Sequence, residues 1–124
     1  MKKILIIAIA LMASVTYASA QAKIKFDKTT HNFGKFEESE KQHATFTFTN
    51  TGDQPLVINQ VMASCGCTNV KYEKKPVAPG QSGKIEVTYD GEGKFPGYVK
   101  KNITVRSNAA GAEIVRLYIE GEMD

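Results

Sequence analysis

Residues 43–50, HATFTFTN, decide the fold class, because apolar and polar side chains alternate along them without a break. Ala44, Phe46 and Phe48 occupy every second position, and threonines occupy the positions after them. In an extended strand, successive side chains point to opposite faces, so this stretch has one apolar face and one β-branched polar face. We therefore predict a strand that covers a core on one side and faces water on the other.

Similar stretches recur along the chain. Strands are expected in KIKF (23–26), HNFGKF (31–36), PLVINQVMA (55–63), GKIEVTYD (83–90), KKNITVRS (100–107) and EIVRLYIEG (113–121), of which the first two should supply the first edge. Turn-forming residues separate them in NTGDQP (50–55), APGQSG (78–83), DGEGKFPG (90–97) and SNAAGA (107–112). Short strands at this spacing predict an all-β fold, an antiparallel β-sandwich of about seven to eight strands.

Residues 1–20 have the three-part layout of a secretory signal peptide. Two lysines precede the apolar run ILIIAIALMA, and SVTYASA follows it, with Ala18 and Ala20 at the small positions of an A-x-A cleavage site. We predict Sec-type export to the periplasm or beyond, cleavage after Ala20, and one mature domain at 21–124. The apolar run is shorter than the roughly 18 residues that a membrane span needs, so no span is expected after cleavage.

The charge of the mature chain is close to balanced. Removal of the two lysines lowers the basic count from 16 to 14 against 13 acidic residues, which leaves a net charge of +1. Nucleic-acid-binding proteins carry a strong basic excess, so we expect no nucleic acid as partner.

Five segments of the mature chain occur in an order that resembles one known family. They are HNFGKF, FTFTNTGDQPLVINQV, SCGCT, VAPGQSGKIEVTYD and GYVKKNITVRSN. The chain resembles the secreted bacterial proteins called domain of unknown function 1573, and its most specific piece is SCGCT after N-T-G-x-x-P-L. The resemblance implies an immunoglobulin-like sandwich, related in architecture to ASH and major-sperm-protein domains, and an exported location. It implies no function.

The segment SCGCTN (64–69) contains both cysteines of the chain, Cys65 and Cys67. In a fully extended strand their Cα atoms would lie about 6.6 Å apart, at the upper end of the range for disulfides. Gly66 is expected to act as a hinge, because glycine can take a positive φ and bend the chain. Such a bridge would be strained and easily reduced, and closing so small a loop would stabilise the fold little.

Four interpretations of the pair remain open. It forms a local disulfide that shapes a turn, or a redox pair that exchanges with partner thiols, or a Cu(I) site made of two thiolates, or two reduced thiols packed beside the core. In the redox case a nearby lysine, Lys71, Lys74 or Lys75, would lower a thiol pKa.

Zinc and hydrolytic chemistry are less favoured. A structural zinc site needs four ligands, and besides the cysteines the chain offers only His31 and His43, in an unfamiliar spacing. Neither histidine has a nucleophile at a recognisable spacing, and no hydrolase signature accompanies the cysteines. We therefore expect no enzyme and no resident cofactor other than the Cu(I) alternative.

The sequence thus favours an exported, non-catalytic immunoglobulin-like module that binds an unknown partner protein. Such sandwiches bind through end loops or by pairing an exposed edge strand with a partner. The candidate binding loop comprises Ser64, Thr68, Asn69, Lys71, Lys74 and Lys75. Two alternatives are a thiol–disulfide exchange protein that uses Cys65 and Cys67, and a Cu(I)-binding module on the same pair.

Overall fold

The computed structural model describes residues 20–124, which form eight strands and, within that range, no helix. The strands are β1 (Ile24–Phe26), β2 (Thr30–Phe36), β3 (Gln42–Asn50), β4 (Ile58–Ala63), β5 (Thr68–Tyr72), β6 (Ser82–Tyr89), β7 (Gly97–Ser107) and β8 (Ile114–Met123). The predicted signal peptide lies outside the described residues, apart from Ala20. No helix in the described part is long and apolar enough to cross a membrane.

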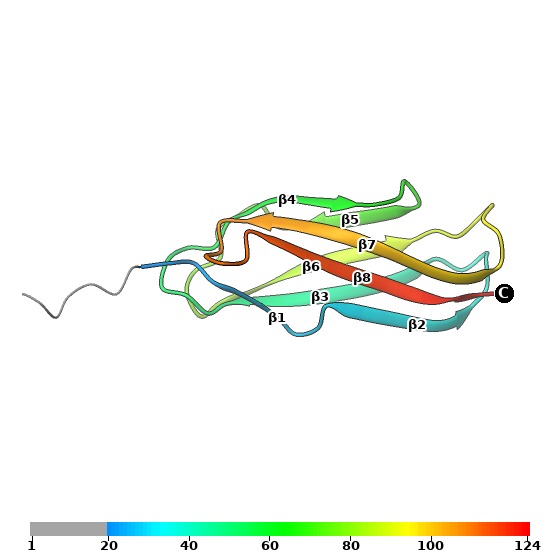
Figure 1. Ribbon diagram of the computed structural model, residues 1–124, viewed down its shortest axis with the longest axis horizontal. Coiled ribbons are helices and arrows are strands. Elements are labelled where there is room, and N and C mark those ends of the chain that lie inside the picture. Colours follow the sequence, from blue (N-terminus) through cyan, green and yellow to red (C-terminus); the bar gives the residue numbers. More distant parts are fainter. Residues whose placement is uncertain (1–19) are drawn as a thin grey trace, which may run out of the picture.

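The strands form two stacked four-stranded sheets, with the orders β1-β3-β6-β5 and β2-β8-β7-β4 (Figure 1). The predicted β-sandwich is therefore confirmed, including the number of strands. One pairing differs from the expected antiparallel arrangement, because β2 runs parallel to β8. The prediction that KIKF and HNFGKF share one edge is also wrong, since β1 is an edge of the first sheet and β2 an edge of the second.

The chain changes sheet between β1 and β2, and Asp27 and Thr29 explain how. The backbone N–H of Asp27 donates to Thr47 O at 2.9 Å, and its Oδ1 accepts the N–H of Thr47 at 3.1 Å, which ends β1 against β3. Two residues later, Thr29 O accepts the N–H of Tyr118 at 2.7 Å, which starts the pairing with β8. The crossing therefore needs only three residues, too few to leave a clear pattern in the sequence.

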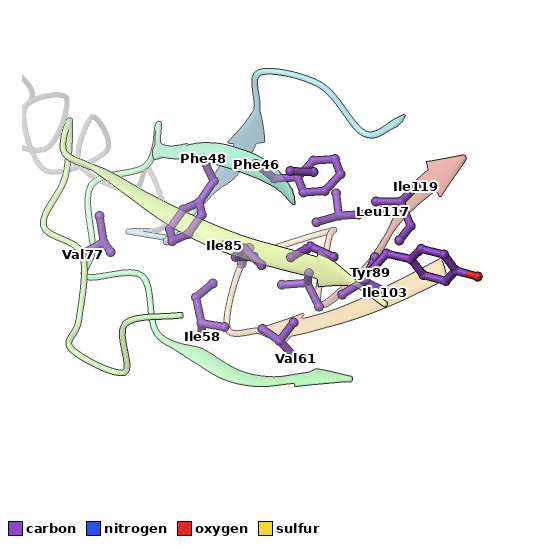
Figure 2. Close-up of a cluster of buried hydrophobic side chains, with 14 of the residues drawn as sticks. Phe46, Phe48, Ile58, Val61, Val77, Ile85, Tyr89, Ile103, Leu117 and Ile119 are labelled. Carbon is purple, nitrogen blue, oxygen red and sulfur yellow. The ribbon is translucent and has the colours of Figure 1, made fainter. Parts of the chain in front are cut away.

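The core lies between the sheets and is built from the apolar faces of the alternating strands (Figure 2). Phe46 pairs with Ile85 in the first sheet, and Ile103 pairs with Leu117 in the second. All four side chains are fully buried. The alternation that predicted the strands thus also identified which face of each strand is buried.

One end of the sandwich gathers three of the connections. The turn between β4 and β5, the loop between β6 and β7, and the loop between β2 and β3 all lie there, next to the carboxyl terminus (Figure 1). The N–H of Asp90 donates to Cys67 O at 2.9 Å, and the N–H of Gly93 donates to Glu38 Oε1 at 3.1 Å, which links these connections. We call this the cysteine end. The first residues of β1 and the loop at 50–57 lie at the opposite end.

Candidate functional site

The cysteine turn, residues 64–67, connects β4 to β5. Cys65 O accepts the N–H of Thr68 at 3.1 Å, which closes a four-residue turn. Cys65 and Cys67 are joined by a disulfide, and their Cα atoms are 5.2 Å apart. The turn shortens this distance from the extended value into the middle of the range that disulfides span. The N–H of Cys67 also donates to Cys65 Sγ at 3.1 Å.

Gly66 does not act as the predicted hinge. The glycines with positive φ in the described chain are Gly34, Gly80, Gly93, Gly97 and Gly111, and Gly66 is not among them. A Cβ atom at Gly66 would also meet nothing within 4 Å. The bend comes from an ordinary turn that most residues can adopt.

The cysteine turn bridges the two sheets. On the side of the second sheet, the N–H of Ser64 donates to Asn102 O at 3.0 Å, and Ser64 Oγ accepts the N–H of Asn102 at 3.2 Å. On the side of the first sheet, Cys67 O accepts the N–H of Asp90. Because β4 and β5 are edge strands of different sheets, the disulfide lies where the chain passes from one sheet to the other.

The two cysteines are neither fully buried nor fully exposed. Both are half-buried, while Ser64 and Gly66 beside them are exposed. Cys67 packs against the core cluster, and its Sγ lies 3.9 Å from Thr68 Oγ1. The pair is therefore partly accessible to solvent.

The residues of the candidate binding loop do not form one surface. Thr68, Asn69 and Lys71 belong to β5, so the prediction of a loop there is wrong. The sequence signal for this strand was the alternation of Thr68, Val70 and Tyr72, which face the core. A period of two over only five residues is too short to predict a strand. Thr68 is buried opposite Tyr89, and Lys71 lies opposite Glu86 on the outer face.

Lys74 and Lys75 follow the far end of β5 and are exposed there. A strand of five residues is about 13 Å long, so these lysines lie well away from the disulfide. Lys71 is also outside the turn. The structure thus gives no support to a lysine that acts directly on the cysteine sulfurs.

The two histidines lie apart from the cysteine turn. His31, on β2, has Lys28 Nζ 2.8 Å from its Nδ1. Burial, and then the positive charge of Lys28, lower the pKa of His31 below its usual value. His43 Nδ1 is 3.1 Å from Thr88 Oγ1 on the outer face of the first sheet. Within residues 20–124, no three histidine, cysteine or acidic side chains come together in a way that could hold a metal ion.

Phe95, which sequence reasoning did not single out, is the most exposed large apolar side chain described. It is 93% exposed in the loop between β6 and β7. The N–H of Lys94 donates to Gly91 O at 3.0 Å, and the loop is tied to Glu38 through Gly93. The available signal was an aromatic residue inside a segment of turn-forming residues, GEGKFPG, where nothing calls for a core side chain.

The sequence profile of one family, described as protein of unknown function (DUF1573), matches residues 24–123. The chain belongs to the DUF1573 family. The resemblance seen in the sequence is thus confirmed, and this DUF1573 domain extends from the first residue of β1 to the last residue of β8. No curated protein matches the sequence.

Several solved structures share the fold of this DUF1573 domain. A protein of unknown function from Porphyromonas gingivalis W83 has a TM-score of 0.73 at 18% identity, over 87% of this chain and 50% of its own. The ASH/PapD-like domain 7 of human CEP192 has a TM-score of 0.67 at 9% identity, over 90% and 92%. The YadV chaperone has a TM-score of 0.60 at 13% identity, over 82% and 52%.

These similarities concern the fold alone. The DUF1573 chain spans about half the length of the Porphyromonas protein and of YadV, and nearly all of the CEP192 domain. They confirm the expected similarity in architecture to ASH-type sandwiches.

Proposed function

We propose that this protein is an exported, non-catalytic module that binds a partner protein through its cysteine end. The observation that carries the proposal is the near-complete exposure of Phe95 in a loop bonded to the cysteine turn. The similarity in fold to a chaperone, YadV, also supports a binding function.

Phe95 has the properties of a binding anchor. Its loop is held by the bonds to Glu38 and Gly91, and Pro96 follows it, so the ring is presented at little cost in conformational entropy. Burying a phenylalanine side chain contributes about 1.5 to 3 kcal/mol, and aromatic residues are enriched among the side chains that dominate binding energy. Tyr98, 67% exposed near the start of β7, lies three residues after Phe95.

The proposal is tested by site-specific crosslinking in cells that export the protein. A photoreactive phenylalanine analogue in place of Phe95 should crosslink to one partner protein. The matched control is the same analogue at Ile114, a half-exposed apolar position at the opposite end. With the purified partner, Phe95→Ala should weaken binding about tenfold to a hundredfold, because it removes the buried ring. Equal crosslinking at both positions, or none at Phe95, would contradict the proposal.

A second candidate function is thiol–disulfide exchange, favoured by the bonded cysteines in a half-exposed turn. In this reaction a partner thiolate attacks one sulfur of the disulfide, which forms a mixed disulfide and releases the other cysteine as a thiolate. A second thiol of the partner then attacks the partner sulfur of the mixed disulfide. The partner leaves with a new disulfide, and both cysteines of this protein are reduced. The test is reduction of insulin with a dithiol regenerant. A rate equal to that of a Cys65→Ser, Cys67→Ser variant would eliminate this function.

Binding of Cu(I) is a further proposal, and it requires prior reduction, because sulfurs in a disulfide are not thiolate ligands. Titration with Cu(I) under a non-thiol reductant measures it. An equal Cu(I) affinity in the Cys65→Ser, Cys67→Ser variant would show that the cysteine pair is not the binding site.

A further inference from the structure

Residues 21–23, which the predicted cleavage places at the start of the mature chain, are docked onto the fold. The N–H of Asp53 donates to Gln21 O at 2.9 Å, and the N–H of Ala110 donates to Ala22 O at 2.9 Å. Ala22 is only 4% exposed and belongs to the core cluster. The segment therefore packs between the loop at 50–55 and the loop at 107–113.

Gly52 shows how close this docking is. A Cβ atom at Gly52 would lie 2.6 Å from Lys23 N and would overlap with Gln21 O. Oδ1 of the buried Asn50 accepts the N–H of Gly52 at 2.9 Å and of Lys23 at 3.3 Å. The NTG segment thus forms a groove, lined by the Asn50 side chain and by the backbone of Gly52, and residues 21–23 lie in it.

At the beginning of this groove, the backbone nitrogen of Gln21 is 2.7 Å from Asp53 Oδ1. Ala20, the residue before it, is exposed. The nitrogen that faces the Asp53 carboxylate is thus the atom that cleavage after Ala20 would release.

We propose that Asp53 forms a binding site for the new N-terminus of the mature protein. Hydrolysis of the peptide bond between Ala20 and Gln21 by a signal peptidase consumes one water. It leaves a carboxylate on Ala20 and an ammonium group on Gln21. The ammonium replaces the neutral amide N–H as the donor to Asp53, and a hydrogen bond between two charged groups is stronger than one with a neutral donor. Signal peptide cleavage thereby strengthens the contact between Gln21 and Asp53, which holds residues 21–23 to the fold.

Two measurements test the site. The first is N-terminal sequencing and intact mass of the protein exported from its full chain, which should begin at Gln21 with a free amino group. The second compares chains that begin at Gln21 with chains that begin at Ala20, in which the ammonium lies one residue away. The equilibrium constant for unfolding in urea should be about two- to fivefold larger for the Ala20 chain, as for an exposed ion pair.

Asp53→Asn should abolish this difference, because it keeps an oxygen acceptor and removes the charge. Asp90→Asn is the matched control, since Asp90 Oδ1 also accepts a backbone N–H, that of Glu92 at 3.0 Å, at the other end. Should Asp53→Asn fail to fold, acetylation of the Gln21 amine gives the same comparison.

Three results would overturn the proposal. They are an exported protein that begins at another residue, a first residue that has lost ammonia to form a lactam, and a stability difference that persists in Asp53→Asn.

Discussion

Asn50 connects the backbone segments at the end of the sandwich opposite the cysteines. Its side chain is fully buried. Nδ2 donates to Gln54 O at 2.7 Å and to Val77 O at 3.0 Å, and Oδ1 accepts two backbone N–H groups. One asparagine thus joins the end of β3 to three separate backbone segments. The N-T-G segment is for this reason a structural feature of the fold.

We predict that Asn50→Ala destabilises the fold by about 3 kcal/mol or more. The substitution leaves buried backbone donors and acceptors without partners, and each costs about 1 to 3 kcal/mol. The free energy of unfolding in urea measures the loss. The control is Asn69→Ala on the exposed face of β5, which should change stability by less than about 0.5 kcal/mol. Equal effects of the two substitutions would contradict the role of Asn50.

Substitution by alanine should affect two glycines to very different extents. Gly66→Ala should change stability by less than about 0.5 kcal/mol, because the site has no positive φ and open space for a methyl group. Gly52→Ala should cost more than about 2 kcal/mol, because the methyl group meets backbone atoms of Gln21 and Lys23 that cannot move separately. Thermal unfolding of both variants tests this pair, and a large loss in Gly66→Ala would restore the hinge that the structure argues against.

At the scale of elements, the alternating strands were predictable and the connections between sheets were not. β3, β6, β7 and β8 are long enough for the apolar period to stand out, and their burial follows it. β5 has only five residues after the cysteine turn. The parallel pairing of β2 with β8 has no local signal, because strand direction depends on where the chain crosses between sheets.

The same limit explains what could be predicted of the candidate site. Cys65 and Cys67 were identified because they are adjacent in sequence. Phe95 lies 28 residues beyond Cys67, and only the pairing of β5 with β6 and the bond from Asp90 to Cys67 bring its loop to the turn. The lysines after β5 are closer in sequence, but the length of β5 separates them from the turn. A contact set by sheet topology cannot be read from sequence distance.

The disulfide should contribute little to the stability of β4 and β5. Closing a loop of three residues removes little entropy from the unfolded chain, which corresponds to about 1.5 kcal/mol. We predict that Cys65→Ser, Cys67→Ser remains folded, with the free energy of unfolding lowered by about that amount. Both edge strands keep their ladders to β6 and β7. Urea unfolding of the wild type with and without reductant gives the comparison, and loss of cooperative unfolding after reduction would show that the bond holds the sheets together.

Across the whole molecule, the two ends of the sandwich differ in structure. The end that contains Asn50 holds residues 21–23 through the Asn50 side chain and the backbone of the NTG segment, whereas the cysteine end exposes Phe95 in a loop that bonds to Cys67 through Asp90. The buried apolar residues between them form one core cluster, part of which Figure 2 shows. Residues 21–23 therefore lie at the end opposite the surface that we propose for the partner.

The stability of the whole molecule should fall in alkali because of Tyr89, which closes the core at the cysteine end. Its ring packs edge-on against Phe36 at a centroid distance of 6.1 Å and is 1% exposed. Burial, and then the charge of Asp90, raise the pKa of Tyr89 above its usual value of 10.0. The folded state thus holds the phenol proton more tightly than the unfolded chain. Stability is fully present below pH 10.0 and is lost as the pH rises through the folded pKa.

Tyr89→Phe keeps the packed ring and removes the ionisable group, so its unfolding midpoint in urea should depend less on alkaline pH than that of the wild type. Tyr98→Phe is the comparison. Tyr98 is exposed on the outer face of the second sheet. Its hydroxyl donates to Glu120 Oε2 at 2.6 Å, and this hydrogen bond is the main reason that the pKa of Tyr98 is raised. An exposed phenol can ionise without breaking the core, so this variant should retain most of the alkaline loss. If Tyr98→Phe removed the loss and Tyr89→Phe did not, alkaline unfolding would begin on the sheet surface and the core would open only afterwards.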